Sequence, residues 1–197
     1  RDMTGYVNTE LESTDEWWSY MQLPVEAKGL TEETSIAIAQ QIQRAEVTLP
    51  TGTVMTSYVV GEEPSSGSHS DAEPLLLLHG FDSSLFEFRR LVPLLAQQRR
   101  VYAVDMAGFG FCDRTSDCFQ TKKPTDTVNP DLIRQHLVGF IEQVIDSPVI
   151  LVGASMGGGV AIDLSVSHPE LVEKLVLLDA VGFAPAPVIG RFMFSPV

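Results

Sequence analysis

The chain contains little cysteine, and this limits the chemistry open to it. Its 197 residues include only two cysteines, Cys112 and Cys118. Two thiols are too few for a disulfide framework, and their spacing is not that of metal ligands. We therefore interpret both as reduced thiols, which favours a location inside the cell, in the cytoplasm or an organelle. We expect neither a metal nor a cofactor.

Basic residues and long hydrophobic runs are also scarce. The chain has 13 Lys and Arg against 26 Asp and Glu, a formal net charge of −13. Such a surface repels phosphate groups, which argues against nucleic acid and anionic membranes as partners. The longest apolar runs, such as residues 75–78 and 149–152, are far shorter than the ~20 residues of a transmembrane helix. We expect a soluble protein that acts on a small molecule, of unknown oligomeric state.

From residue 74 onward, apolar strands alternate with helices. We predict strands within residues 74–81, 99–110, 148–155 and 173–180, and helices within residues 84–98, 129–145 and 156–172. Continuous apolar strands separated by helices predict an α/β fold, with a mostly parallel sheet covered on both faces. Functional groups of such sheets lie at the carboxyl ends of the strands. His79, Asp105, Ser155 and Asp179 all occupy such positions.

The residues before 74 predict a different organisation. Apolar residues at helical spacing predict an amphipathic helix over residues 33–47, and residues 45–60 have the pattern of two strands joined by a turn. We divide the chain into an N-terminal arm and helix, 1–44, a core, 45–185, and the start of a cap or lid, 186–197.

A serine with a glycine two residues before it and another two residues after it is the strongest indication of catalytic chemistry in the sequence. Gly153 and Gly157 flank Ser155 in the pattern G-x-S-x-G, between an apolar strand and a helix that begins with small residues. This context is typical of a nucleophile elbow, a sharp turn that pushes the serine hydroxyl into a cleft. An ordinary strand-to-helix turn is the alternative.

A second motif, His79-Gly80-Phe81, follows the strand that starts at residue 75. When a serine attacks a carbonyl, negative charge develops on the carbonyl oxygen, and main-chain N–H groups can stabilise it. Phe81 and Met156 are each placed to offer one such N–H. We expect His79 to fix the loop by hydrogen bonding rather than to act as a catalytic base.

Together these motifs resemble those of the α/β-hydrolase superfamily, in its esterase, lipase and C–C hydrolase branch, over about residues 45–185. The resemblance implies that Ser155 is the nucleophile that attacks an ester-like substrate. It implies that the main-chain N–H groups of Phe81 and Met156 form the oxyanion hole. It also implies that Asp105, Gly108 and Gly110 shape a turn. Serine rather than aspartate at position 155 argues against the epoxide-hydrolase and dehalogenase branches.

The family's catalytic acid and histidine follow the serine along the chain. Only His168 follows Ser155, and its "SHPE" context is typical of the end of the next helix, so we do not expect it to be the base. Asp179 is a candidate acid, although structural aspartates are commoner at strand ends. Asp163 is expected to face solvent or a neighbouring helix.

The remaining histidines, His69 and His136, are expected to be solvated, in a loop and on a helix face. The chain thus offers no credible general base, and we expect it to be the N-terminal part of a longer serine hydrolase, inactive by itself. The alternative is a non-catalytic relative that binds a small apolar ligand in the same cleft.

Overall fold

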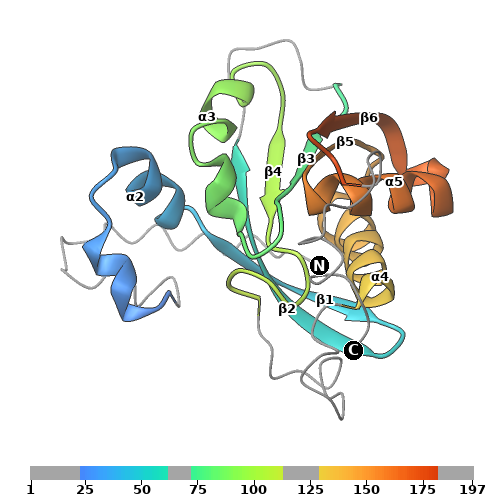
Figure 1. The fold of residues 1–197 in the computed structure, drawn as a ribbon, viewed down its shortest axis with the longest axis horizontal. Helices are drawn as coiled ribbons and strands as arrows, with labels where there is room; N and C mark the ends of the chain where they lie inside the picture. The colour runs from blue at the N-terminus through green and yellow to red at the C-terminus, as the bar shows by residue number, and fades with distance from the viewer. Residues whose placement is uncertain (1–22, 62–71, 113–128, 182–197) are drawn as a thin grey trace, which may run out of the picture.

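The computed structural model describes residues 23–61, 72–112 and 129–181 (Figure 1). Within them, six strands form one sheet in the order β1-β2-β4-β3-β5-β6. The strands are β1 (Gln43–Leu49), β2 (Gly52–Gly61), β3 (Leu75–Leu78), β4 (Val101–Val104), β5 (Val149–Ala154) and β6 (Val172–Leu178). β2 runs antiparallel to β1 and β4, whereas β3 is parallel to β4 and β5, and β5 is parallel to β6. The mostly parallel sheet is confirmed.

Helices cover both faces of this sheet (Figure 1). The α-helices are α2 (Glu33–Ala39), α3 (Val92–Leu95), α4 (Pro130–Phe140) and α5 (Met156–Ser167). The 3₁₀- and π-helical segments are η1 (Val25–Gly29), η2 (Leu85–Phe88), η5 (Ile141–Ile145) and η6 (Pro169–Leu171). Successive strand residues point to opposite faces, so Leu76 and Leu78 pack with α4 and α5, while Leu77 packs with α2, η2 and α3.

The register of the central strands brings three chain segments together. Leu78, the last residue of β3, lies opposite Val104 of β4 and Gly153 of β5. Because these strands are parallel, the residues that follow them leave the sheet at the same edge. His79, Asp105 and Ser155 are therefore gathered at one end of the sheet.

The helix predicted over residues 33–47 is shorter than expected. α2 ends at Ala39, and the strand β1 begins at Gln43. The reason is a complete antiparallel ladder between β1 and β2. In this ladder the side chains of Val47 and Leu49 are buried on one face of the strand, and Thr48 between them is exposed on the other. This ladder satisfies the backbone and buries alternate side chains, which a continuing helix could not do. The expected boundary at residue 45 thus lies inside β1.

The helix predicted over residues 84–98 is divided into η2 and α3. Ser84 caps the first turn by accepting a hydrogen bond from the Phe86 N–H at 3.4 Å. Pro93 lies in the first turn of α3, where its missing N–H costs nothing. In the middle of one continuous helix the same proline would break the hydrogen-bond ladder, so two short helical segments form instead.

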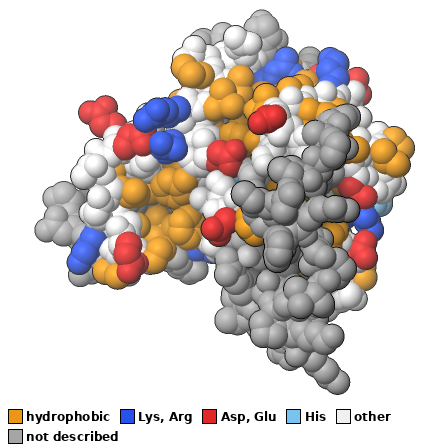
Figure 2. All heavy atoms as spheres, in the orientation of Figure 1, with side chains coloured by type: hydrophobic (Ala, Val, Ile, Leu, Met, Phe, Trp, Pro, Cys, Tyr) orange, Lys and Arg blue, Asp and Glu red, His pale blue; other side chains and the backbone are white. Residues whose placement is uncertain are grey.

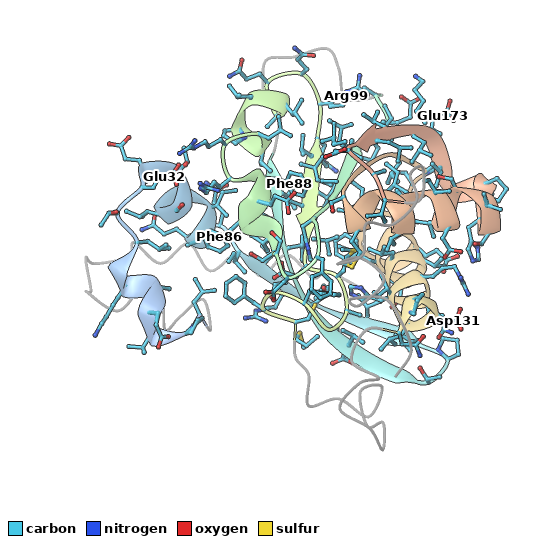
Figure 3. The ribbon with its side chains drawn as sticks, in the orientation of Figure 1. Glu32, Phe86, Phe88, Arg99, Asp131 and Glu173 are labelled. Carbon is cyan, nitrogen blue, oxygen red and sulfur yellow. The ribbon has the colours of Figure 1, made fainter. Side chains whose placement is uncertain are left out.

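Charged side chains join α2 to η2. Glu32, labelled in Figure 3, accepts hydrogen bonds from Arg89 Nε at 2.7 Å and Arg90 Nε at 2.6 Å. These bonds lower the pKa of Glu32 to about 2. The two ion pairs hold the segment that follows η2 against the start of α2.

The prediction that His136 is solvated is wrong. Its side chain is fully buried on the face of α4 that also carries Ile133 and Phe140. Residues three and four apart share one face of a helix, so the apolar stripe carries the histidine into the core. Neither ring nitrogen of His136 has a hydrogen-bond partner in the described structure. Burial lowers its pKa to about 4, and the ring is neutral at pH 7.

Candidate active site

Ser155 lies at the turn between β5 and α5. Its backbone has φ 49° and ψ −113°, a conformation that side-chain-bearing residues rarely adopt, and the residue is exposed. The turn is anchored to the end of β6 and to the residues just after it: the Ser155 N–H donates to Leu178 O at 3.0 Å, and the Val181 N–H donates to Ser155 O at 3.0 Å. The serine is therefore held in a strained turn that leaves it accessible.

Glycine is required where this turn packs against β3. A Cβ atom on Gly157 would lie 2.3 Å from the carbonyl oxygen of Leu78 and 2.5 Å from that of His79. One on Gly153 would lie 2.4 Å from the carbonyl oxygen of Gly157. Both clashes are with backbone atoms, which cannot move without shifting the strand or the helix to which they belong. The G-x-S-x-G spacing thus allows the start of α5 to touch the end of β3.

The buried ring of His79 holds the adjacent loop. The carbonyl oxygen of Gly80 can only accept, so His79 Nδ1 donates to it, at 2.8 Å. Nε2 accepts from the Met106 N–H at 3.2 Å. Burial lowers the pKa of His79, an effect opposed by the Gly80 carbonyl and the Glu87 carboxylate. With both nitrogens engaged, the ring is suited to fixing the loop and not to accepting a proton from Ser155.

The His79-Gly80 loop runs beside the serine. A Cβ atom on Gly80 would lie 3.5 Å from Ser155 Cβ, an ordinary contact distance. All described peptide bonds are trans, so the Phe81 N–H points opposite to the Gly80 carbonyl that faces His79. Met156 is buried at the first position of α5, where main-chain N–H groups have no partner within the helix.

Aromatic rings border this end of the sheet. The Phe81 ring is 40% exposed and packs edge-to-face on Phe109, with centroids 5.9 Å apart. Phe109 also packs edge-to-face on His79, at 5.8 Å. Phe81 therefore offers an apolar surface within the loop that passes Ser155.

Asp105 organises the turn after β4. Its Oδ1 accepts from the Leu85 N–H at 2.7 Å, and its Oδ2 accepts from the Phe111 N–H at 2.8 Å. Burial raises the pKa of this carboxyl to about 6, although both hydrogen bonds favour the charged form. Gly110 and Gly108 have φ 54° and 86°, and a Cβ on Gly110 would lie 2.3 Å from Asp105 Cγ. The carboxylate is thus enclosed by the turn.

Asp163 and His168 lie further along α5, away from Ser155 at its start. His168 ends α5, the helix that starts after Ser155, and its Nδ1 lies 3.2 Å from Glu170. Asp163 accepts from Arg134 of α4 at 2.8 Å, so it faces a neighbouring helix as predicted. Asp179 is exposed after β6, with φ 48°. In the described part of the chain, no side chain hydrogen-bonds the Ser155 hydroxyl, and His69 lies outside that part.

The described residues contain no group of three or more His, Cys, Asp or Glu side chains that could hold a metal ion. They also contain no helix with the length and apolar character needed to cross a membrane. Cys112 is a free, buried thiol whose pKa burial raises to about 12, and Cys118 lies outside the described residues. The thiolate is therefore not available at Cys112 at neutral pH.

One residue near the serine could not be predicted from the sequence. Glu87 of η2 accepts a hydrogen bond from the Gly80 N–H, with Oε2 at 2.8 Å. A Cβ atom on Gly80 would lie 3.6 Å from the same oxygen. The available signal was weak: a glutamate one turn after the serine that caps η2.

Comparison with known proteins identifies the family. The family model described as "alpha/beta hydrolase fold" matches residues 73–193. The chain belongs to the α/β hydrolase family. This matched range contains the His79-Gly80 loop, the Asp105 turn and Ser155, the segments that the parallel strands bring together.

Individual α/β hydrolases agree with this assignment. The chain is 37% identical to the alpha/beta hydrolase domain-containing protein VTE7 of Arabidopsis thaliana, over 82% of this chain and 47% of that protein. It is 37% identical to the 2-hydroxymuconate semialdehyde hydrolase of a Pseudomonas species, over 55% of this chain and 37% of that enzyme. The chain spans less than half the length of these relatives.

A solved structure agrees as well. A meta-cleavage product hydrolase of Pseudomonas fluorescens superposes with a TM-score of 0.55 at 28% identity. The match covers 70% of this chain and 45% of that enzyme. The α/β hydrolase fold predicted from the sequence is therefore confirmed.

Proposed function

We propose that the protein is a serine hydrolase that cleaves an ester, a thioester or a related carbonyl bond of a small molecule. The observation that carries this proposal is Ser155, exposed in a strained turn at the carboxyl end of β5. Unfavourable backbone conformations of this kind cluster at active sites, and the nucleophile of a nucleophile elbow is one example. The hydrolases among its relatives support the same chemistry.

In the proposed reaction, the Ser155 oxygen adds to the substrate carbonyl carbon as its proton passes to a general base. The charge that develops on the carbonyl oxygen is stabilised by the main-chain N–H groups of Phe81 and Met156. The scissile bond breaks, the leaving group takes up a proton, and the acyl group remains on Ser155. Water then attacks this acyl group, and the serine regains its proton. The described residues do not supply the base.

The surroundings of Ser155 favour an apolar substrate. The Phe81 ring is partly exposed and backed by Phe109, so an acyl or alcohol chain could lie against it. Aromatic rings contribute large apolar contact areas to binding pockets. The Pseudomonas relatives, named for a semialdehyde and for meta-cleavage products, indicate that C–C bond hydrolysis next to a carbonyl should be tested along with ester hydrolysis.

The proposal is tested on the native protein with p-nitrophenyl esters of increasing acyl length and with a meta-cleavage dienoate. Ser155→Ala should reduce kcat by a factor on the order of 10³ or more, with little change in KM. The matched control is Ser167→Ala, the same substitution at the exposed far end of α5. Loss of activity in both variants, or in neither, would contradict the proposal.

The alternative function, binding of a small apolar ligand without catalysis, gives a different result. A binding protein would show no turnover with any of these substrates, and Ser155→Ala would leave its ligand affinity unchanged. Turnover that disappears in Ser155→Ala while ligand affinity persists excludes the alternative. The two functions are therefore separated by one pair of variants.

A further inference from the structure

We propose that Glu87 is a positioning residue for the oxyanion-hole loop. The proposal rests on the proposed serine-hydrolase function and concerns how the loop beside Ser155 is held. Glu87 Oε2 accepts the hydrogen bond of the Gly80 N–H at 2.8 Å, and Gly80 directly precedes Phe81, the proposed oxyanion donor. Glu87 acts through this main-chain contact and not on the substrate.

Gly80 is held from both sides. Its N–H donates to Glu87, and its carbonyl oxygen accepts from His79 Nδ1 at 2.8 Å. These two groups belong to successive peptide planes, so the two bonds together fix the rotation of the chain at Gly80. Glycine is the residue with the greatest backbone freedom. Without such bonds, the direction of the following Phe81 N–H would be poorly defined.

Glu87 itself is well placed to hold the loop. It lies between Phe86 and Phe88, both labelled in Figure 3, and Phe88 is 3% exposed. The Leu85 N–H is bound to the buried Asp105 carboxylate at 2.7 Å, which fixes the start of η2. Arg89 pairs with Glu32, which fixes its end. The carboxylate therefore extends from a helical turn anchored on both sides.

The proposed role depends on an acceptor oxygen rather than on negative charge. One point, the Cβ position of Gly80, lies 3.6 Å from Glu87 Oε2 and 3.5 Å from Ser155 Cβ. A carboxylate this near to the serine disfavours the negative charge that develops in the reaction. A neutral side chain of the same length that keeps the oxygen should therefore serve as well.

The test compares Glu87→Gln with Glu87→Met in the native protein. Glutamine keeps an acceptor oxygen at the same reach, whereas methionine has similar length and no acceptor oxygen. A loop donor that is misplaced by about 1 Å can cost on the order of 10²-fold in rate. We expect Glu87→Met to lose 10- to 100-fold in kcat with KM within about twofold, and Glu87→Gln to stay within about threefold of the wild type. Glu142→Met, at an exposed glutamate of η5, is the control.

A second measurement follows the Gly80 amide directly. Hydrogen exchange of this N–H, read by NMR, should be slow in the wild type and in Glu87→Gln and faster in Glu87→Met. An unchanged kcat in a folded Glu87→Met variant, a change in KM alone, or unchanged Gly80 exchange would each overturn the positioning role. If Ser155→Ala is as active as the wild type, the proposed serine mechanism fails, and the positioning role fails with it. Full dependence on Ser155 with no effect at Glu87 overturns the positioning role alone.

Discussion

At the scale of single residues, Gly157 determines whether the serine turn can form. Its missing side chain lets α5 approach the carbonyl oxygens of Leu78 and His79. We predict that Gly157→Ala destabilises the protein by about 1–3 kcal/mol because the methyl group forces backbone shifts. It should also reduce the reactivity of Ser155. Urea unfolding and fluorophosphonate labelling measure the two effects.

The control for this prediction is Gly159→Ala, two residues further along α5. There an added Cβ would lie within 3 Å of a side-chain atom only, Val181 Cγ2 at 2.8 Å, and that side chain can move. Alanine favours a helix over glycine by about 1 kcal/mol, so this variant should be at least as stable as the wild type. Equal effects of the two substitutions would contradict the close-approach argument.

His136 makes the stability of the fold depend on pH. Its pKa is about 4 in the folded protein and has an ordinary value of 6.5. Between these values the unfolded chain binds more protons at His136 than the folded protein does. The contribution of His136 to the free energy of unfolding is therefore constant above pH 6.5 and falls as the pH falls toward 4. The slope is at most about 1.4 kcal/mol per pH unit. We predict that His136→Leu removes this dependence.

The measurement for His136 is urea unfolding of wild type and variant at several pH values from 4.5 to 7.5. Asp105, with its pKa raised to about 6, contributes a slope of opposite sign, because the folded state binds the extra proton. The difference between the two proteins isolates His136, since Asp105 is common to both. Parallel stability curves would mean that the histidine is not buried in its neutral form.

At the scale of elements, Asp105 joins η2 to the turn after β4. It is the acceptor for two main-chain N–H groups, those of Leu85 and Phe111. We predict that Asp105→Ala costs about 2 kcal/mol or more, because both groups lose their partner. Asp163→Ala, which removes an ion pair at a half-exposed position, should cost less than about 1 kcal/mol. Similar losses in the two variants would contradict the organising role of Asp105.

The order of the elements could be predicted from the sequence, and some boundaries could not. Long apolar strands such as Val149–Ala154 leave little choice but a buried parallel sheet. Residues 43–49 fit both a helical and an alternating pattern, and only pairing with β2 decided between them. Pro93 lies at the start of α3, but the apolar residues around it suggested one helix over residues 84–98.

Parts of the candidate site could likewise be predicted from the sequence, and other parts could not. Ser155 has a sequence signature because the turn around it requires glycine at positions 153 and 157, and the His79-Gly80 pair is marked by its place directly after an apolar strand. The contact of Glu87 with Gly80 has none, since any acceptor of suitable reach could bind a main-chain N–H. The burial of His136 depended on which face of α4 meets the core, and a single polar residue within an apolar stripe does not show whether it is buried.

At the scale of the whole molecule, net charge should affect which substrates reach Ser155. The chain carries a formal charge of −13, and in Figure 2 the described acidic side chains are spread over the visible face, with basic ones beside some of them. We predict that kcat/KM for an anionic ester rises several-fold from low salt to about 0.15 M, as screening weakens repulsion. A neutral ester of the same size should show no such rise. Equal salt dependence of the two esters would contradict the prediction.

Covalent labelling shows whether Ser155 is an activated nucleophile. The native protein is treated with a fluorophosphonate, digested, and mapped by mass spectrometry. We expect a covalent adduct on the Ser155 hydroxyl and none on Ser167, with labelling abolished by prior denaturation. A folded protein that forms no adduct at Ser155, or that is labelled equally at both serines, would contradict it.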